Sequence, residues 1–180
     1  MKSKNVSKRN KYLFVGSVLL IAGLASIFSQ RFRHQLVKTL PSPTGTASTV
    51  TGVVAKVIDG DSIVLSTGEN IRYIGINTPE IENGECFATE SAKVNSDLVL
   101  GKTVTLVKDT SETDKYGRLL RYVYEGDTFV NDYLVKNGYA RLMTIFPDTG
   151  FENQFTNSEN YARQNSLGLW KKCKNTINTP

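Results

Sequence analysis

Residues 53–80 read VVAKVIDGDSIVLSTGENIRYIGINTPE, and this stretch decides the fold. Valine and isoleucine dominate it, and two turn-forming runs, DG at 59–60 and TGE at 67–69, interrupt it. β-Branched residues separated by turns that contain Gly and Asp are typical of antiparallel hairpins. The stretch therefore predicts three consecutive strands, at residues 53–58, 62–65 and 70–76, and Pro79 marks the end of the third.

Further along the chain, hydrophobic periodicity predicts two more strands and three helices. Apolar residues recur at helical spacing at residues 88–100, and further helices are expected at residues 129–136 and 151–165. Runs rich in β-formers at residues 103–108 and 119–124 add the fourth and fifth strands. Five short strands with one helix between them and two helices after them predict an α+β fold. We expect a five-stranded OB-fold β-barrel with three packed helices.

The first 50 residues differ in composition from the rest of the chain. Residues 1–11 are basic, residues 12–29 carry no charge, and residues 30–50 become rich in Pro, Ser, Thr and Gly. An uncharged run of this length predicts a membrane-spanning helix, and the larger basic cluster before it places the N-terminus in the cytoplasm. An extended linker would then lead to an extracytoplasmic domain at residues 51–173, followed by a tail at residues 174–180.

The apolar run has a second interpretation, as a signal peptide cleaved near the small residues GLA at 23–25. Its length and the basic residues that follow it favour an uncleaved anchor. Both interpretations export the domain. We expect a single-pass protein of the cell membrane, with secretion after signal cleavage as the alternative.

Cys86 and Cys173 are the two cysteines of the sequence. Two thiols so far apart do not form a zinc site by themselves. In an exported chain they predict one disulfide, which would join an early loop or helix start to the C-terminal end. The alternative is a pair of unbonded, buried thiols.

Charge and histidine content exclude several kinds of site. The net charge is +5, but the residues from 51 onward include 14 basic and 17 acidic side chains, a net charge of −3. The single histidine, His34, lies in the linker, so the domain has no histidine base and no Ser-His triad. A glycine-rich phosphate loop is also missing. Catalysis would have to use carboxylates, guanidinium groups and a hard metal ion.

The DGD run, which places Asp59 and Asp61 between two strands, has two interpretations. On its own such a run is most often a hairpin turn. Its functional alternative is an oxygen site for Ca²⁺ or Mg²⁺, which take carboxylate and carbonyl ligands. This motif alone favours the turn.

The NTPE run follows the third predicted strand. It is either a strand end broken by proline with Glu80 in solvent, or a site. In the second case Asn77 and the Thr78 carbonyl would face a metal, with Glu80 near a water. The neighbouring Glu82 and Glu85 are interpreted as surface charge.

Two arginines stand out by their position. Arg72 lies in the middle of an apolar strand, and Arg118 opens a later one. Each could belong to a sheet edge or a basic turn. A guanidinium also suits phosphate, because its planar fork donates two hydrogen bonds at once. Together with carboxylates and no histidine, the arginines favour metal-assisted attack of water on a phosphodiester.

In these motifs the sequence resembles the staphylococcal nuclease (thermonuclease) family. The runs VIDGDSIVL, IRYIGINTPE, TDKYGRLLRYVY, VNDYLVKNGYARL and GLW occur in this order, from residue 53 to about residue 170. The resemblance implies a five-stranded OB-type barrel with three helices, and cleavage of DNA and RNA with Ca²⁺.

The resemblance also implies roles around the metal. Asp61, Asn77 and the main-chain carbonyl of Thr78 would be the Ca²⁺ ligands. Asp59 would support these ligands without itself contacting the metal. Glu80 would orient or deprotonate the attacking water.

Further roles are implied at the substrate. Arg72 and Arg118 would hold the scissile phosphate and stabilise its developing charge. Lys115 and Tyr116 would contact a terminal phosphate. Cleavage would fall on the 5′-oxygen side and leave 3′-phosphates, and we expect the enzyme to act as a monomer.

The sequence departs from the family at two points. Well-known members carry Asp where this chain has Asn77, and the loss of one negative charge predicts weaker Ca²⁺ binding. Many members carry Tyr-x-Tyr where this chain has Thr144-Ile145-Phe146. Phe146 can still stack on a base, but the hydroxyl contact is lost.

Two other functions are weighed against the nuclease. One is a non-catalytic module of the same fold that binds nucleic acid or protein. Arg72, Glu80 and Arg118 are all retained, which argues against it. The other is a metal-dependent phosphodiesterase that acts on lipids or nucleotides near the membrane.

Overall fold

The computed structural model describes residues 49–173. The expected membrane span at residues 12–29, most of the expected linker and the tail at residues 174–180 lie outside the described residues. Contacts divide the chain into two units, residues 1–44 and 45–180, and the described residues belong to the second. Between residues 49 and 173 there is no helix long and apolar enough to cross a membrane.

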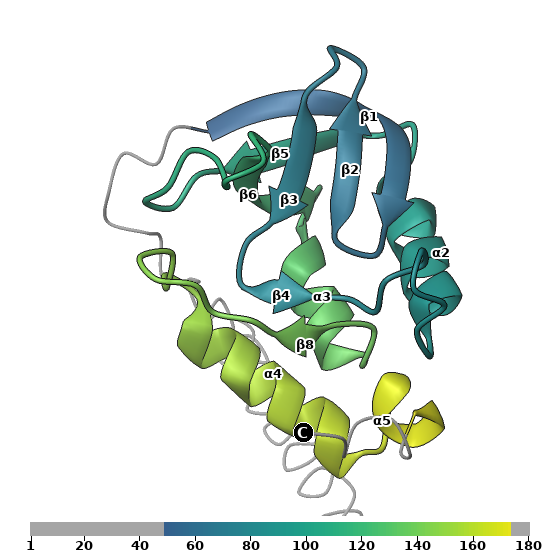
Figure 1. Ribbon diagram of the computed structural model, residues 1–180. Helices are drawn as coiled ribbons and strands as arrows, with labels where there is room; N and C mark the ends of the chain where they lie inside the picture. Colours follow the sequence, from purple (N-terminus) through teal and green to yellow (C-terminus); the bar gives the residue numbers. More distant parts are fainter. Residues whose placement is uncertain (1–48, 174–180) are drawn as a thin grey trace, which may run out of the picture. The chain divides into compact units, whose positions relative to one another are not determined.

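Five strands form a closed barrel (Figure 1). Strands β1, β2 and β3 follow one another as an antiparallel meander, and β5 pairs with the other edge of β1. Strand β6 is antiparallel to β5 and parallel to β3, so it closes the ring. The bounds of these strands are β1 Thr49–Asp59, β2 Ser62–Leu65, β3 Asn70–Tyr73, β5 Thr103–Val107 and β6 Leu119–Glu125.

Three helices of seven or more residues accompany the barrel in residues 49–173. Helix α2 contacts β1, helix α3 contacts β6, and helix α4 packs against α3. The bounds of the remaining elements are α2 Ala88–Val99, α3 Val130–Lys136, α4 Glu152–Gln164, α5 Leu169–Lys172, β4 Ile76–Asn77, β7 Thr128–Phe129 and β8 Arg141–Leu142. The prediction of an α+β fold with a five-stranded barrel and three helices is confirmed, and the parallel pairing of β3 with β6 makes the barrel mixed.

The hydrophobic core fills the barrel and continues between the barrel and the helices. Alternate residues of the strands point inward and are fully buried, as a sheet with one face on the core requires. Ile63, Ile71 and Val123 belong to this set, and Leu134 of α3 and Phe155 of α4 complete it. The core therefore fixes the relative positions of the strand ends, where the site residues lie.

The third predicted strand is interrupted, which corrects the expected range of residues 70–76. Strand β3 ends at Tyr73, and after a turn the short β4 pairs antiparallel with β8. The turn needs Gly75, because its φ is +78° and a Cβ there would lie 2.5 Å from Cε2 of Phe155. The chain thus changes direction just before Asn77. At the other end, β1 begins at Thr49, two residues inside the range predicted as linker.

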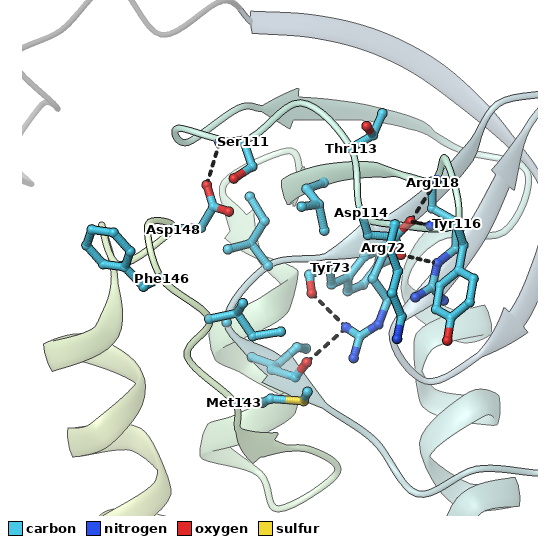
Figure 2. Close-up of a pocket in the computed structure, with 16 residues that line it drawn as sticks. Arg72, Tyr73, Ser111, Thr113, Asp114, Tyr116, Arg118, Met143, Phe146 and Asp148 are labelled. Atoms are coloured by element: carbon cyan, nitrogen blue, oxygen red, sulfur yellow. Dashed lines mark hydrogen bonds and ion pairs between the residues drawn. The ribbon is translucent and has the colours of Figure 1, made fainter.

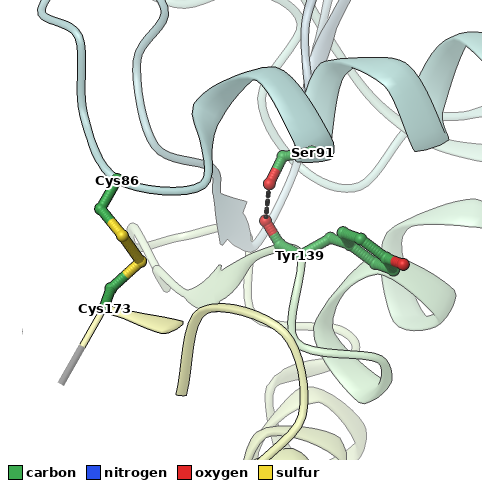
Figure 3. The surroundings of a disulfide bond; sticks show 4 residues. All are labelled: Cys86, Ser91, Tyr139 and Cys173. Atoms are coloured by element: carbon green, nitrogen blue, oxygen red, sulfur yellow. Dashed lines mark hydrogen bonds between the residues drawn. A yellow bond between two sulfur atoms is a disulfide. The ribbon is translucent and has the colours of Figure 1, made fainter. Parts of the chain in front are cut away.

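The predicted disulfide is present between Cys86 and Cys173, which are separated by 87 residues (Figure 3). It joins a residue two positions before the start of α2 to the residue that follows α5. Cys173 is buried in a second, smaller apolar cluster with Ala162, Leu169 and Trp170. Phe87 packs against this cluster, so the disulfide and apolar contacts hold the same junction.

Candidate active site

The turn between β1 and β2 carries two carboxylates. The backbone N–H of Asp61 donates to Oδ1 of Asp59 at 3.0 Å, which closes the turn. From α2, the buried Asn95 side chain donates to the Asp59 carbonyl at 3.0 Å. Gly60 is required here, since a Cβ would lie 2.6 Å from Cγ2 of Thr78. The turn therefore packs directly against the NTPE run, and residues of both segments can contribute to one site.

Asp61 is the most buried carboxylate of the turn, with 1% of its surface exposed. Its Oδ2 accepts the backbone N–H of Thr78 at 2.9 Å and forms an ion pair with Nη2 of Arg72 at 3.0 Å. The same Nη2 atom donates to Oδ1 of Asn77 at 2.9 Å. One guanidinium nitrogen thus lies within 3.0 Å of an oxygen from each of two residues predicted to bind metal.

Carbonyl contacts fix the guanidinium of Arg72 from its other side. Its Nη1 donates to the carbonyls of Tyr73 at 2.7 Å and Ile76 at 2.9 Å, across the turn that contains Gly75. The break between β3 and β4 therefore builds the cradle of Arg72. The side chain is 12% exposed, so it faces the site and not open solvent.

The electrostatics of the two key carboxyl groups oppose ionisation in the metal-free protein. Burial raises the pKa of Asp61 to about 7, although the charge of Arg72 counteracts this and that of Asp59 adds to it. Burial also raises the pKa of Glu80, and the charge of Asp59 contributes in the same direction. Arg72 and Arg118 both lower the pKa of Glu80, so this carboxyl group lies within the field of both arginines.

The oxygen atoms at this position suit a hard cation. Oδ2 of Asp61 and Oδ1 of Asn77 converge on one nitrogen, and the Thr78 carbonyl accepts from Nδ2 of Asn77 at 3.2 Å. Carboxylate, amide and carbonyl oxygens are the ligands that Ca²⁺ takes in proteins. Among the residues that the structure describes, no group of three or more His, Cys, Asp and Glu side chains could hold a metal. Any cation here would rely on mixed oxygen ligands.

Arg118 is held by a carboxylate that the sequence interpretation left without a role. Asp114 accepts from Nε of Arg118 at 2.7 Å, from its backbone N–H at 3.0 Å and from the N–H of Tyr116 at 2.9 Å. Burial opposes ionisation of Asp114, but these hydrogen bonds outweigh it and lower its pKa. The spacing of four residues in DKYGR was visible in the sequence, whereas the wrapping of the loop around the carboxylate was not.

A cavity of about 530 Å³ connects these groups (Figure 2). Arg72 and Arg118 both line it, together with Lys115, Tyr116 and Phe146. Phe146 is 86% exposed and lies on the opposite side of the cavity from Tyr116, which is 72% exposed. Lys115 and Arg118 lie over the Tyr116 ring, 4.9 Å and 5.6 Å from its centroid. Cationic groups and two exposed aromatic side chains therefore border one space. An arrangement of this kind can bind a phosphate and an aromatic base together.

The structure brings most of the predicted site residues together. Asp61, Arg72, Asn77 and Thr78 are linked by direct contacts, whereas Arg118, Lys115, Tyr116 and Phe146 join them only through the cavity. The sequence interpretation missed Asp148, which is buried and accepts the N–H groups of Thr110 and Ser111 at 2.9 Å and 2.7 Å. No local pattern marks a carboxylate that ties two loops 37 residues apart.

The chain is similar in sequence to known proteins. Residues 70–172 match the family described as "Staphylococcal nuclease homologue". The chain is 34% identical over 126 residues to the SPbeta prophage-derived endonuclease YokF of Bacillus subtilis (strain 168), covering 65% of this chain and 43% of that protein. It is 35% identical over 126 residues to endonuclease YncB of the same organism, covering 65% and 60%. It is 27% identical over 167 residues to the thermonuclease of Staphylococcus hyicus, covering 89% and 98%. The matches thus span less than two thirds of the two Bacillus relatives.

Proposed function

Because this chain belongs to the staphylococcal nuclease family, we propose that it is a calcium-dependent endonuclease. It hydrolyses phosphodiester bonds of DNA and RNA with low sequence specificity and leaves 3′-phosphate ends. One observation carries the proposal: Arg72 and Arg118 line one cavity beside the oxygen cluster of Asp61, Asn77 and Thr78. The ring order of the barrel supports the OB-type assignment, a fold whose surface suits oligonucleotides.

Asp61, Asn77 and the Thr78 carbonyl would hold the cation. When bound, Ca²⁺ supplies a positive charge that polarises a phosphoryl oxygen and offsets the negative charge of the transition state. The side chain of Asn77 contributes an oxygen without a charge. The site therefore holds its cation with fewer negative charges than one that has Asp at this position.

Glu80 acts as the general base. It accepts a proton from the water whose oxygen attacks phosphorus, and the bond from phosphorus to the 5′-oxygen breaks. The released 5′-oxygen takes up a proton from solvent. The products are a 3′-phosphate and a free 5′-hydroxyl. The raised pKa of Glu80 brings its basicity closer to neutral pH, where a carboxylate of ordinary pKa is a weak base.

Arg72 and Arg118 bind the phosphate and stabilise the charge that develops on its oxygens. Asp114 occupies Nε of Arg118, which directs the contact to phosphate onto the terminal nitrogens of this guanidinium. Lys115 and Tyr116 would bind a terminal phosphate. Phe146, on the opposite side of the cavity, would stack on a base.

Export is part of the proposal. A disulfide persists in oxidising compartments, and the bond between Cys86 and Cys173 supports an extracytoplasmic domain. The uncharged run at residues 12–29 and the basic residues around it support a membrane tether. Fractionation of cells that express the full chain tests this, because a cleaved signal would release the domain into the medium.

The function is tested by incubating the purified chain with single-stranded DNA, RNA and a phospholipid, each with Ca²⁺ or with EDTA. We expect cleavage of both nucleic acids, inhibition by EDTA, 3′-phosphate products and an intact lipid. Binding of DNA without cleavage under any divalent cation would instead support a non-catalytic module. Hydrolysis of the lipid would support a different phosphodiesterase.

A further inference from the structure

Glu80 and Glu85 are the two ends of a short loop that is closed by a pair of hydrogen bonds. The N–H of Glu85 donates to the carbonyl of Glu80 at 3.2 Å, and the N–H of Glu80 donates to Oε2 of Glu85 at 3.1 Å. Within the loop, the N–H of Gly84 donates to the carbonyl of Ile81 at 3.0 Å. Backbone and side chain of Glu85 thus both contact the residue proposed as general base.

The far end of this loop is anchored twice. Cys86, the residue after Glu85, is bonded to Cys173 at the end of α5 (Figure 3). Phe87 follows, and its ring stacks on that of Tyr139 with 5.6 Å between the ring centroids. Glu85 is therefore attached to a segment that the C-terminal cluster holds in place.

The backbone of this segment is costly to form. Phe87 has φ = +75°, a left-handed conformation that a bulky residue adopts only when its surroundings impose it. Phe87 follows the disulfide-bonded Cys86 and packs against the smaller apolar cluster, which limits its freedom to relax. Strained backbone of this kind is typical of places where a functional group must be held in position.

From these contacts we infer that Glu85 is a positioning residue, which holds the backbone of Glu80 so that its carboxylate meets the attacking water in a fixed place. The inference rests on the proposed function, since it assigns a role in the same reaction. Glu85 is exposed, in line with its interpretation as surface charge. Its carboxylate nevertheless accepts a hydrogen bond from the N–H of Glu80, and the next residue, Cys86, is held by the disulfide. Proton transfer needs this precision, because a small displacement of the base lowers the rate steeply.

The test compares three variants of the full chain in steady-state cleavage of single-stranded DNA with Ca²⁺. In Glu85→Ala the acceptor is lost, and we expect kcat to fall about tenfold with KM unchanged. Glu85→Gln keeps an oxygen acceptor and should retain most of the wild-type kcat. Glu82→Gln removes a charge from the same loop without touching Glu80. It serves as the matched control, in which kcat and KM should both stay at the wild-type values.

A second measurement separates positioning from general damage to the fold. In a Glu80→Gln background the base is absent, so Glu85→Ala should cause no further loss in single-turnover rate. An additional tenfold loss in that background would mean that Glu85 does not act through Glu80. Such a result would overturn the inference.

Failure of the inference differs from failure of the proposed function. An active wild type with an unchanged kcat in Glu85→Ala overturns the positioning role alone. A wild type that cleaves no nucleic acid under any divalent cation overturns the nuclease and the positioning role with it. A loss in Glu85→Gln as large as in Glu85→Ala would assign the effect to charge and also overturn the role described here.

Discussion

Arg72 is ion-paired with the buried carboxylate of Asp61, with Nη2 3.0 Å from Oδ2. The residue proposed to bind phosphate thus holds the residue proposed to bind the cation. A cation at Asp61 would compete with the guanidinium for the same oxygen and weaken the ion pair. Metal binding and the freedom of Arg72 to turn to phosphate are therefore coupled, and several predictions depend on this pair.

The charge of residue 77 should set the affinity for calcium. Asn77→Asp places a second negative charge at the cation site, because this side chain faces Arg72 beside Asp61. We expect Ca²⁺ to bind about tenfold more tightly, since affinity follows the charge of the ligands. Isothermal titration calorimetry of the metal-free protein measures this. Equal affinities of variant and wild type would mean that Asn77 does not contact the cation.

Calcium binding should depend on pH through Asp61. Burial raises its pKa from 3.8 to about 7, so between these values the folded metal-free state binds more protons than the unfolded state. The contribution of Asp61 to the free energy of unfolding is therefore fully present below pH 3.8, and it is lost as pH rises through about 7. Ca²⁺ binds the ionised form, so it should raise the melting temperature more at pH 8 than at pH 5.

Thermal melts with EDTA or CaCl₂ at the two pH values check this expectation. Asp61→Asn has no titratable group at the position and serves as the control, in which the pH-dependent part of the Ca²⁺ effect should disappear. If Ca²⁺ shifts the wild-type melting temperature equally at both pH values, titration of Asp61 does not govern binding.

Removal of the base should separate catalysis from binding. In Glu80→Gln the side chain keeps its size but cannot take a proton, and we expect the cleavage rate to fall by about 10²–10⁴-fold. DNA binding, measured by fluorescence anisotropy with Ca²⁺, should stay close to that of the wild type. A variant that loses binding in parallel with cleavage would show that Glu80 acts mainly in holding the site together.

The exposed ring of Phe146 should contribute to substrate binding. Stacking of a base on an aromatic ring is worth about 1–3 kcal/mol, so Phe146→Ala should raise KM about tenfold with little change in kcat. Phe146→Leu keeps an apolar side chain without a ring face, and Phe146→Tyr keeps the ring. A normal KM in the leucine variant would show that apolar contact suffices, against the stacking role.

The disulfide should matter for stability. It closes a loop of 87 residues. The double variant Cys86→Ser with Cys173→Ser lacks this bond, so its unfolded chain has a higher conformational entropy. We expect the free energy of unfolding to fall by about 2–4 kcal/mol, as measured in urea. Dithiothreitol should lower the stability of the wild type to that of the double variant and leave the variant unchanged. A variant as stable as the oxidised wild type would contradict the prediction.

The sequence alone predicted most of the fold, because its signals are local. Alternating apolar residues and turn-forming glycines mark strands wherever one face of a sheet is buried, and β1, β2, β5 and β6 lie close to their predicted ranges. The break between β3 and β4 was missed, because the apolar alternation continues through Gly75. The ring of Phe155, from a helix 80 residues away, lies where a side chain at position 75 would be.

The site divides in the same way. Arg72 could be picked from the sequence, since a charged side chain within an apolar strand needs a reason. For Asp61, Asn77 and Glu80 the local pattern left a turn or a strand end open, and the resemblance to the family favoured a site. The contacts among these residues could not be predicted. Parallel pairing of β3 with β6 sets Arg72 opposite Leu120, and this pairing brings Arg118 to the same cavity.

The roles of two further carboxylates also depend on tertiary structure. Asp114 and Glu85 are ordinary acidic residues in the sequence. Only the closing of their loops brings Asp114 to the side chain of Arg118 and Glu85 to the backbone N–H of Glu80. Composition and periodicity determine which residues can be buried and which can do chemistry. Long-range pairing and loop closure, which no local pattern encodes, determine which of them meet.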